Sequence, residues 1–422
     1  MAQCVYVYKR GPNKGKTCGE TVEPTQTLCR KHAGDRLINI LEANKKTTKR
    51  IQEDILRDRI LALQTTIENK AVIMRHFYNM KRLDINSSEY YKNQMFVDAC
   101  LSFPWNSQFN VQKIVESTGV RAFIKYLQSH LDNEIYGMES VKNEIINVVC
   151  KLITNPNANR NNIALYGKAG IAKSKIIKVL SDVLGIPMKT ISLGGIKDSS
   201  FFLGHGYVYV ESGPGKILQN IIDSKVNNPI VYFDELDKVS ETSNGTDIYS
   251  FLCYLTDPTQ NNEFTDHYFY GMKFDLSKVL YVFTFNDISK VNPVLLDRLN
   301  VIYVSPPCEA DTVYILQRYS VPEILKNIGI QQPFRLEDAS VISVMSFCKD
   351  YIDFNVSSGI REYYRVIEKV FLEINKCLLL QTSHFGPDDY TISNAKFSEF
   401  FDKVKTQFLH INDNTSFSNM YM

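Results

Sequence analysis

Apolar residues in the first quarter of the chain recur at helical spacing. Residues 35–103 contain neither glycine nor proline, and intervals of three or four positions separate six apolar side chains. These residues are Leu56, Ile60, Leu63, Ile67, Ala71 and Met74. This spacing places them on one helical face, so we expect one or more long helices, with an antiparallel pair as one arrangement. The charged residues between them are expected to face solvent, and packing against a partner subunit is the alternative.

From about residue 130 the pattern changes to short apolar runs that alternate with amphipathic segments. Buried strands are predicted at NIALYG (162–167), PIVYFDELD (229–237) and VLYVFTFND (279–287), and a helix at KSKIIKVLSDVLG (173–185). This alternation predicts an α/β fold in which helices flank a mainly parallel sheet on both faces. Residues 309–380 return to helical spacing.

The composition argues against several classes of protein. With 422 residues, of which 44% are hydrophobic and 22% charged, the chain can build two or three folded domains. Its net charge of +2 creates no field that draws the whole chain to nucleic acid or membrane. It lacks a long apolar run, and its nine cysteines, an odd number, suit a reducing compartment. We therefore expect a soluble, intracellular chain with no membrane partner.

Residues 167–175, GKAGIAKSK, come close to the phosphate-binding loop G-x-x-x-x-G-K-[ST]. Gly167, Lys173 and Ser174 are in register, Gly170 lies inside the loop, and Ala172 replaces the last glycine. Such a loop points backbone N–H groups at phosphates, while the lysine reaches the β- and γ-phosphates and the hydroxyl holds Mg²⁺. For the loop alone, a chance turn rich in glycine and lysine is the alternative.

Two further strand ends carry polar residues. Asp234 and Glu235 end the second apolar run, at the carboxyl edge where parallel α/β sheets bind ligands. We expect Asp234 to complete the Mg²⁺ shell with Ser174, and Glu235 to activate the attacking water. Asn286 is placed to contact the γ-phosphate or that water, and Arg298 to stabilise phosphoryl charge across a subunit boundary. Taken singly, these residues fit a helix N-cap, a strand cap and a surface charge, but their order favours nucleotide chemistry.

Longer segments around these residues resemble the AAA+ ATPase module of Lon-type proteases. The resemblance covers roughly residues 97–378 and includes LSFPWN, LDNEIYGMESVK, ISLGGIKDSSFFLGHGYVYVESGPGKILQ, DPTQNNEFTDHYF, VLLDRL and SSGIREYYRVIEKV. It implies a P-loop AAA+ fold and an ATP- and Mg²⁺-dependent ATPase that forms a homohexameric ring. By this resemblance, Tyr136 and Gly137 lie beside the adenine, and Arg361 senses the nucleotide from a helical lid. Tyr209 and Val210 match the pair that grips a polypeptide client in the central pore.

The first departure from that family is at the C-terminus. About 44 residues follow the region of resemblance, fewer than a domain of typical size, and no Ser–Lys peptidase dyad can be assigned. We therefore expect an ATPase that is not itself a protease, with a separate peptidase or a recruited viral protein as further partners. The expected divisions are a Cys/His module at 1–33, a helical region at 34–130, an α/β nucleotide-binding domain at 131–305, a lid at 306–380 and a tail at 381–422.

The second departure is Ala172. If the loop needs a positive φ at this position, the methyl group adds ~1–2 kcal/mol of strain, and otherwise the effect is small. A decayed site would have lost other functional residues as well, yet six of them are present: Lys173, Asp234, Glu235, Asn286, Arg298 and Arg361. We therefore interpret the loop as part of a working nucleotide site.

Four residues near the N-terminus have the types and spacing of metal ligands. Cys4, Cys18, Cys29 and His32 suit a closed tetrahedral Zn²⁺ site, and scattered reduced cysteines are the alternative. The module is similar to ones in proteins of large nucleocytoplasmic DNA viruses, which implies a viral protein in the host cytoplasm or a virus factory. Its basic side chains leave contact with nucleic acid open.

These features predict an ATPase that remodels or unfolds polypeptides. Two other classes stay open. One is a nucleotide-gated scaffold, for example in virion morphogenesis, and the other is an ATPase that acts on nucleic acid.

Overall fold

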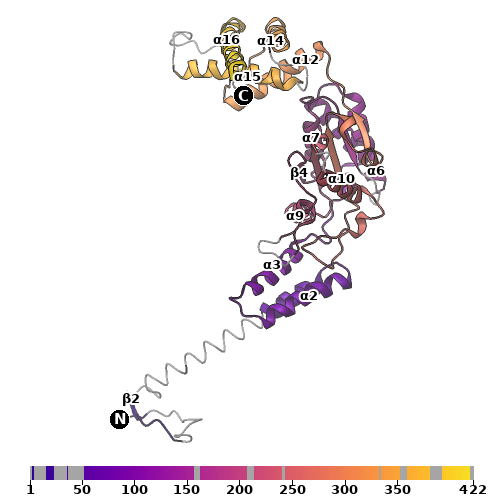
Figure 1. Ribbon diagram of the computed structural model, residues 1–422, viewed down its shortest axis with the longest axis vertical. Coiled ribbons are helices and arrows are strands. Elements are labelled where there is room, and N and C mark those ends of the chain that lie inside the picture. The colour runs from indigo at the N-terminus through magenta and orange to yellow at the C-terminus, as the bar shows by residue number, and fades with distance from the viewer. Residues whose placement is uncertain are drawn as a thin grey trace. The chain divides into compact units, whose positions relative to one another are not determined.

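The computed structural model describes residues 2–3, 16–22, 36, 52–155, 162–206, 213–239, 243–331, 334–351, 359–380 and 392–418 (Figure 1). The chain divides into two compact units, Met1–Trp105 and Asn106–Met422. In the described part of the chain, no helix has both the length and the apolar character that crossing a membrane requires.

The described part of the first unit is mainly helical. Two short strands, β1 (Ala2–Gln3) and β2 (Thr21–Val22), pair in antiparallel fashion. A helix at residues 52–62 precedes α2 (Ile67–Arg82) and α3 (Ser88–Ser102). Helices α2 and α3 lie side by side across a short connection, which makes them an antiparallel pair (Figure 1).

The single apolar stripe predicted for this region is wrong beyond Leu63. The helix ends before residues 63–66, and a new helix begins after Thr66, whose side chain accepts a hydrogen bond from the backbone N–H of Asn69. This break changes the helical register, so Ile67 is 82% exposed. The buried residues of α2 are instead Asn69, Val72, Ile73, Phe77 and Met80.

A five-stranded parallel sheet forms the centre of the second unit and confirms the predicted α/β fold. Its strand order is β4-β5-β6-β3-β7, and every neighbouring pair is parallel. The strands are β3 (Ile163–Tyr166), β4 (Met188–Ser192), β5 (Ile230–Asp234), β6 (Leu280–Phe285) and β7 (Asn300–Tyr303). All six residues of β6 are buried because helices cover both faces of the sheet.

The helices of the α/β region connect these strands. They are α6 (Glu139–Thr154), α7 (Lys173–Leu184), α8 (Ser200–Leu203), α9 (Lys216–Ser224), α10 (Ser243–Thr256) and α11 (Pro293–Leu296). Three single 3₁₀ turns, η1 (Leu236–Lys238), η2 (Asn261–Glu263) and η3 (Ile288–Lys290), complete the connections.

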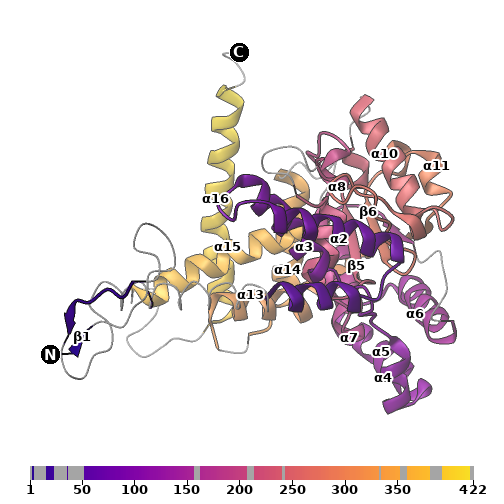
Figure 2. The same cartoon turned by 90° about the horizontal axis from the view of Figure 1, so that it is seen from below.

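Two helices before the sheet belong to the same core. Helices α4 (Val111–Thr118) and α5 (Val120–Glu134) lie beside α6 and α7 (Figure 2). Val115 of α4 and Phe123 and Leu127 of α5 are buried with the apolar residues of β3 and α7. The compact unit therefore begins at Asn106, whereas the expected division lay at residue 130.

A helical region follows the sheet. It contains α12 (Glu309–Ile315), the π-helical turn η4 (Leu316–Ser320), α13 (Val321–Ile328), α14 (Asp338–Tyr351), α15 (Ile360–Leu379) and α16 (Asn394–Ser418). Phe397, Phe400 and Phe401 of α16 are buried in the same core as α14 and α15. The segment expected to be a tail thus contributes a helix that completes the core of the lid.

Candidate functional site

The site is built on one edge of the sheet. Strands β3, β5 and β6 are neighbours in the order β5-β6-β3, and they end at Tyr166, Asp234 and Phe285. Because carboxyl ends of parallel strands share one edge, the residues that follow these strands lie along that edge. This arrangement brings the phosphate-loop candidates, the acidic pair and Asn286 together.

The loop between β3 and α7 needs glycine for close approach. A Cβ atom at Gly167 would lie 2.3 Å from the backbone oxygen of Val304, which is too short for any real contact. The Gly167 N–H also donates to the Phe285 carbonyl at 3.3 Å, so the loop starts against β6. Gly170, with φ of 72°, supplies the left-handed turn in the middle of the loop.

Ala172 occupies a conformation that favours glycine. Its φ of 67° and ψ of 18° place it in the left-handed region, directly before the first residue of α7. For a residue with a Cβ atom, this conformation costs roughly 1–2 kcal/mol. The strain considered for Ala172 from the sequence is therefore present in the structure.

Lys173 joins the loop to the end of β6. Its Nζ donates to the carbonyl oxygens of Gly167 at 2.6 Å and Lys168 at 2.8 Å, and to Oδ1 of Asn286 at 2.8 Å. Burial lowers the pKa of Lys173 from its usual 10.5 to about 8, and the positive charge of Arg361 acts in the same direction. Asp237 and Asp234 oppose that shift. The sequence predicted that Lys173 and Asn286 serve one site, and their side chains are in direct contact.

A chain of hydroxyl groups links the two expected Mg²⁺ ligands. Ser174 Oγ lies 2.8 Å from the Tyr232 hydroxyl, which lies 3.0 Å from Thr284 Oγ1. Thr284 Oγ1 donates to Asp234 Oδ1 at 2.5 Å. Burial raises the pKa of Tyr232 to about 12, so its hydroxyl keeps its proton at neutral pH. Tyr232 and Thr284 were missed from the sequence because each is a single polar group inside an apolar strand.

Ser174 and Asp234 fit a magnesium ion. Mg²⁺ keeps several water ligands and takes only one or two protein carboxylates, with substrate phosphates supplying other oxygens. The described residues contain no cluster of three or more His, Cys, Asp or Glu side chains suited to a metal. The Ser174 hydroxyl and the single Asp234 carboxylate, on either side of the Tyr232–Thr284 link, are ligands of the kind and number that Mg²⁺ takes when it is bound together with phosphate.

Glu235 lies at a sharp turn immediately after β5. Its φ of 60° and ψ of 47° are left-handed, and its N–H donates to Asp234 Oδ1 at 3.0 Å. Its carboxylate lies 3.4 Å from Ser192 Oγ and passes close to Gly194, where a Cβ atom would be 2.6 Å from Oε2. The absence of a side chain at Gly194 therefore leaves the space that the Glu235 carboxylate occupies.

Most of the predicted site residues line one cavity of about 720 Å³. Its walls come from the α5–α6 turn, the phosphate loop, the ends of β5 and β6, and the lid helices. The predicted residues that line it are Tyr136, Gly170, Ala172, Lys173, Ser174, Asp234, Glu235, Asn286 and Arg361. Gly137, with φ of 64°, lies in the turn beside Tyr136.

The lid contributes aromatic side chains that the sequence did not reveal. The Tyr136 ring lies 4.4 Å from that of Tyr314, between centroids. Lys175 Nζ lies 5.8 Å from the centroid of the Tyr319 ring and 3.4 Å from Glu134 Oε2. Tyr319 belongs to the π-helical turn, whose register cannot be read from apolar spacing, so no sequence signal marked it.

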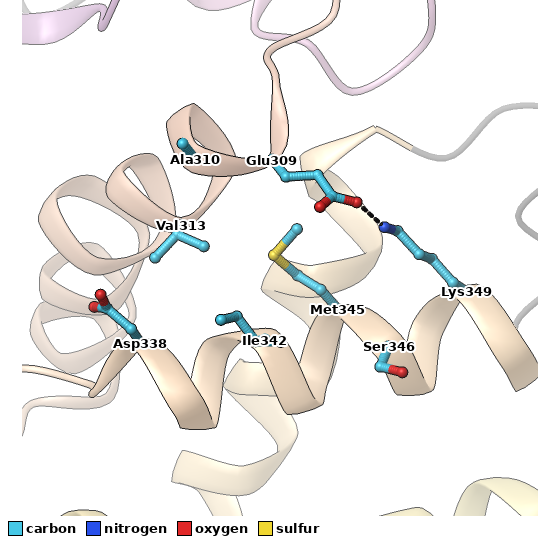
Figure 3. A pocket seen from close by; sticks show the side chains of 8 residues that line it. All are labelled: Glu309, Ala310, Val313, Asp338, Ile342, Met345, Ser346 and Lys349. Atoms are coloured by element: carbon cyan, nitrogen blue, oxygen red, sulfur yellow. Dashed lines mark hydrogen bonds and ion pairs between the residues drawn. The ribbon is translucent and has the colours of Figure 1, made fainter.

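A second cavity, of about 520 Å³, lies within the lid between α12 and α14 (Figure 3). Val313, Ile342 and Met345 form its apolar floor, and the Glu309–Lys349 ion pair crosses its rim (Figure 3). None of the residues predicted to bind nucleotide lines it. The candidate site is therefore the larger cavity at the sheet edge.

Several predicted residues lie elsewhere. Arg298 does not line the nucleotide cavity, and its Nη1 donates to Asp257 Oδ2 at 2.8 Å. Tyr209 and Val210 lie outside the described residues, as do three of the expected zinc ligands: Cys4, Cys29 and His32. The fourth, Cys18, is described as a partly exposed free cysteine.

Comparison with known proteins agrees with this geometry. Residues 163–307 match the family model described as "ATPase family associated with various cellular activities (AAA)". A "Lon protease homolog" of Acanthamoeba polyphaga mimivirus is 32% identical over 295 residues, which are 68% of this chain and 28% of that protein. "Lon protease 1" of Borreliella burgdorferi is 27% identical over 348 residues, covering 82% of this chain and 41% of the relative.

A third relative extends the comparison to eukaryotes. "Lon protease homolog, mitochondrial" of Yarrowia lipolytica is 30% identical over 312 residues, or 74% of this chain and 25% of the relative. The chain thus spans less than half the length of each of these relatives. The parallel sheet, the phosphate loop and these matches support a Lon-like AAA+ ATPase module within the second unit.

Proposed function

We propose that the chain binds and hydrolyses ATP and uses the energy to remodel or unfold polypeptides, as a subunit of a homohexameric ring. The observation that carries the ATPase part is the convergence of Lys173, Asn286 and Asp234 at one sheet edge. The relatives named as Lon proteases support the polypeptide as client, since their names describe action on proteins.

Each side chain in the cavity has a distinct task in this proposal. Lys173 neutralises the β- and γ-phosphates, because phosphate oxygens are stronger acceptors than the carbonyls it now contacts. Ser174 and Asp234 hold Mg²⁺, which supplies further positive charge to the phosphates. Glu235 orients the attacking water, and Asn286 holds that water or the γ-phosphate.

Two arginines act from different places. Arg361 lines the cavity from the first turn of α15, so it contacts nucleotide within its own subunit. Arg298 lies outside the cavity, which supports a role at the ATP bound by a neighbouring copy. The site is then complete only in an assembly of subunits.

The client-binding segment is proposed from the resemblance and from the geometry of its two ends. A Cβ atom at Gly215 would lie 2.0 Å from the Phe202 carbonyl oxygen and 2.7 Å from the Gly204 nitrogen. The chain on either side of Tyr209 and Val210 is therefore closely paired at its base. We propose that these two residues grip the client, and that a separate peptidase or a recruited viral protein works with the ring.

A viral origin is also part of the proposal. The 32% identity with the mimivirus protein supports it, together with the resemblance of the N-terminal Cys/His module to viral ones. In that case the protein acts inside the host cell.

Lys173 makes ATP binding depend on pH. With a pKa of about 8, this lysine is protonated below that pH, whereas above it the lysine must take up a proton before it can pair with phosphate. The dissociation constant for ATP should therefore rise above about pH 8, by up to roughly ten-fold per pH unit. Titrations with a fluorescent ATP analogue, without Mg²⁺, measure this effect. A flat profile for the wild type, indistinguishable from that of Lys173→Met, would contradict the assignment.

Replacing Ala172 by glycine should raise the free energy of unfolding. Relief of ~1–2 kcal/mol of left-handed strain exceeds the ~0.5–1 kcal/mol that glycine adds to the flexibility of the unfolded chain. ATP affinity should stay within about two-fold, because Lys173 and the Ile176 N–H hold the loop in this conformation through protein contacts. Ala169→Gly, at a residue without positive φ, is the control and should only lower stability. Tighter ATP binding with unchanged stability would mean that the loop relaxes when nucleotide leaves.

ATPase assays with and without unfolded polypeptide test the proposed function. The wild type should hydrolyse ATP faster when polypeptide is present, and Glu235→Gln should bind ATP without hydrolysing it. Tyr209→Ala should keep basal hydrolysis and lose the stimulation, while Tyr126→Ala, at an exposed tyrosine of α5, should keep both. If no polypeptide stimulates the wild type, the scaffold hypothesis is favoured. Stimulation by DNA that weakens with salt would favour an ATPase acting on nucleic acid.

We also propose that Cys4, Cys18, Cys29 and His32 hold one structural Zn²⁺, on the support of their spacing alone. Metal analysis of protein purified without added zinc should find close to one zinc per chain. The double change of Cys29 and His32 to serine should remove the metal and spare ATP binding. Cys308→Ser, at an exposed cysteine, is the control. Full zinc content in the double variant would refute the site.

A further inference from the structure

Arg298 is held by an ion pair outside the nucleotide cavity. It lies between α11 and β7, and its Nη1 donates to Asp257 Oδ2 at 2.8 Å. The Asp257 side chain is 13% exposed and that of Arg298 35% exposed, so water screens this pair less than a pair on the open surface. A long, flexible side chain thus has one charged contact that fixes the direction of its guanidinium.

The carboxylate that holds Arg298 is itself oriented by a turn. Asp257 Oδ1 accepts hydrogen bonds from the Thr259 N–H at 2.9 Å and from Thr259 Oγ1 at 2.7 Å. These two bonds are the main reason that the pKa of Asp257 is lowered, and Arg298 adds to the effect. Because Oδ1 is committed to the turn, Oδ2 is left facing the arginine.

The main chain of Arg298 is tied to the same place. Asn162 is buried, and its Nδ2 donates to the carbonyl oxygens of Thr256 at 3.0 Å and Arg298 at 3.3 Å. The carbonyl of Asn162 in turn accepts from the Asn300 N–H at 2.9 Å. One amide side chain therefore fixes the backbone before Asp257 to the backbone of Arg298.

We propose that Asp257, oriented by Thr259, and Asn162 are positioning residues that set Arg298 in the direction from which it reaches phosphate bound by a neighbouring copy of this chain. The inference rests on the proposed function of Arg298. An arginine ordered before the subunits meet loses less side-chain freedom at the moment of reaction, which favours faster hydrolysis. The nucleotide cavity of the same subunit is untouched, so its affinity for ATP should not depend on Asp257.

Two other roles for this ion pair give different outcomes. If the pair only stabilises the fold, its loss should lower thermal stability without a specific change in kcat. If Asp257 instead keeps Arg298 away from phosphate, its neutralisation should raise kcat. Asp257→Asn separates these cases because the amide keeps the shape and an oxygen for the Thr259 turn, while the negative charge is lost.

The first experiment measures kcat, KM, ATP affinity and melting temperature for three variants. Asp257→Asn should lower kcat about ten-fold, or ~1.4 kcal/mol of activation free energy, with KM and ATP affinity within about two-fold. Thr259→Ala, at an exposed position, should lower kcat in the same direction. Asp275→Asn is the matched control, since Asp275 Oδ1 also accepts from an N–H two residues ahead, at 2.9 Å, in the exposed Asp275–Ser277 turn. The kcat, KM, ATP affinity and melting temperature of Asp275→Asn should match those of the wild type.

The second experiment mixes subunits. Asp257→Asn subunits have intact ATP sites but a poorly positioned Arg298. Glu235→Gln subunits have ATP sites that cannot hydrolyse but a correctly positioned Arg298. Rings that contain both variants should therefore hydrolyse more ATP per Asp257→Asn subunit than rings of Asp257→Asn subunits alone. A general folding defect in Asp257→Asn would show no such rescue. Wild-type kcat in both Asp257→Asn and Thr259→Ala, raised kcat, or reduced kcat without rescue would each overturn the inference.

Arg298→Ala distinguishes failure of this inference from failure of the proposed function. If Arg298→Ala is inactive while Asp257→Asn and Thr259→Ala behave as wild type, only the positioning role is wrong. If Arg298→Ala hydrolyses ATP at the wild-type rate, the role of Arg298 itself is wrong, and the positioning role is wrong with it.

Discussion

The Lys173 ammonium is the contact on which the site depends. It joins the carbonyls of Gly167 and Lys168 to the Asn286 side chain, and so connects the loop after β3 with the end of β6. This connection is short because β3 and β6 pair in parallel with Tyr166 opposite Phe285. The same burial that makes these hydrogen bonds strong also lowers the lysine's pKa to about 8. A phosphate that replaces the carbonyls as acceptor restores the interactions that favour the charged form.

Close backbone contacts fix the position of the phosphate loop relative to the sheet and to the lid. Gly167 lies against Val304, which follows β7, and a Cβ atom at Gly359 would lie 2.4 Å from the Ala169 carbonyl oxygen. Gly359 is the residue before α15, the lid helix that carries Arg361. The phosphate loop is therefore packed between the sheet and the lid with no side chain between them at these points. A displacement of the loop by more than a few tenths of an ångström must move the start of α15 as well.

The sequence predicted the sheet and most of the site because both depend on local signals. Strands buried on both faces are continuous apolar runs. Asp234 is the last residue of one such strand, and Asn286 comes directly after another. The contacts that were missed join distant segments, as do Asp257 with Arg298 and α16 with the lid core. The N-cap at Thr66 also starts a new helix, although the apolar spacing in the sequence continues past this residue. The spacing of apolar residues predicts one helix or strand at a time, whereas these features depend on which helices and strands pack together.

The geometry of Glu235 shows why a strained residue belongs at this edge. Along a continued strand, successive side chains point to opposite faces of the sheet, so Asp234 and Glu235 would be directed away from each other. Both nevertheless line the same cavity. The left-handed turn at Glu235 ends the alternation, and a hydrogen bond from its N–H to the Asp234 carboxylate stabilises that turn. The carboxylate then fits beside Gly194, where no side chain blocks it. The backbone strain at Glu235 is thus the structural means by which one strand end directs two carboxylates into a single cavity.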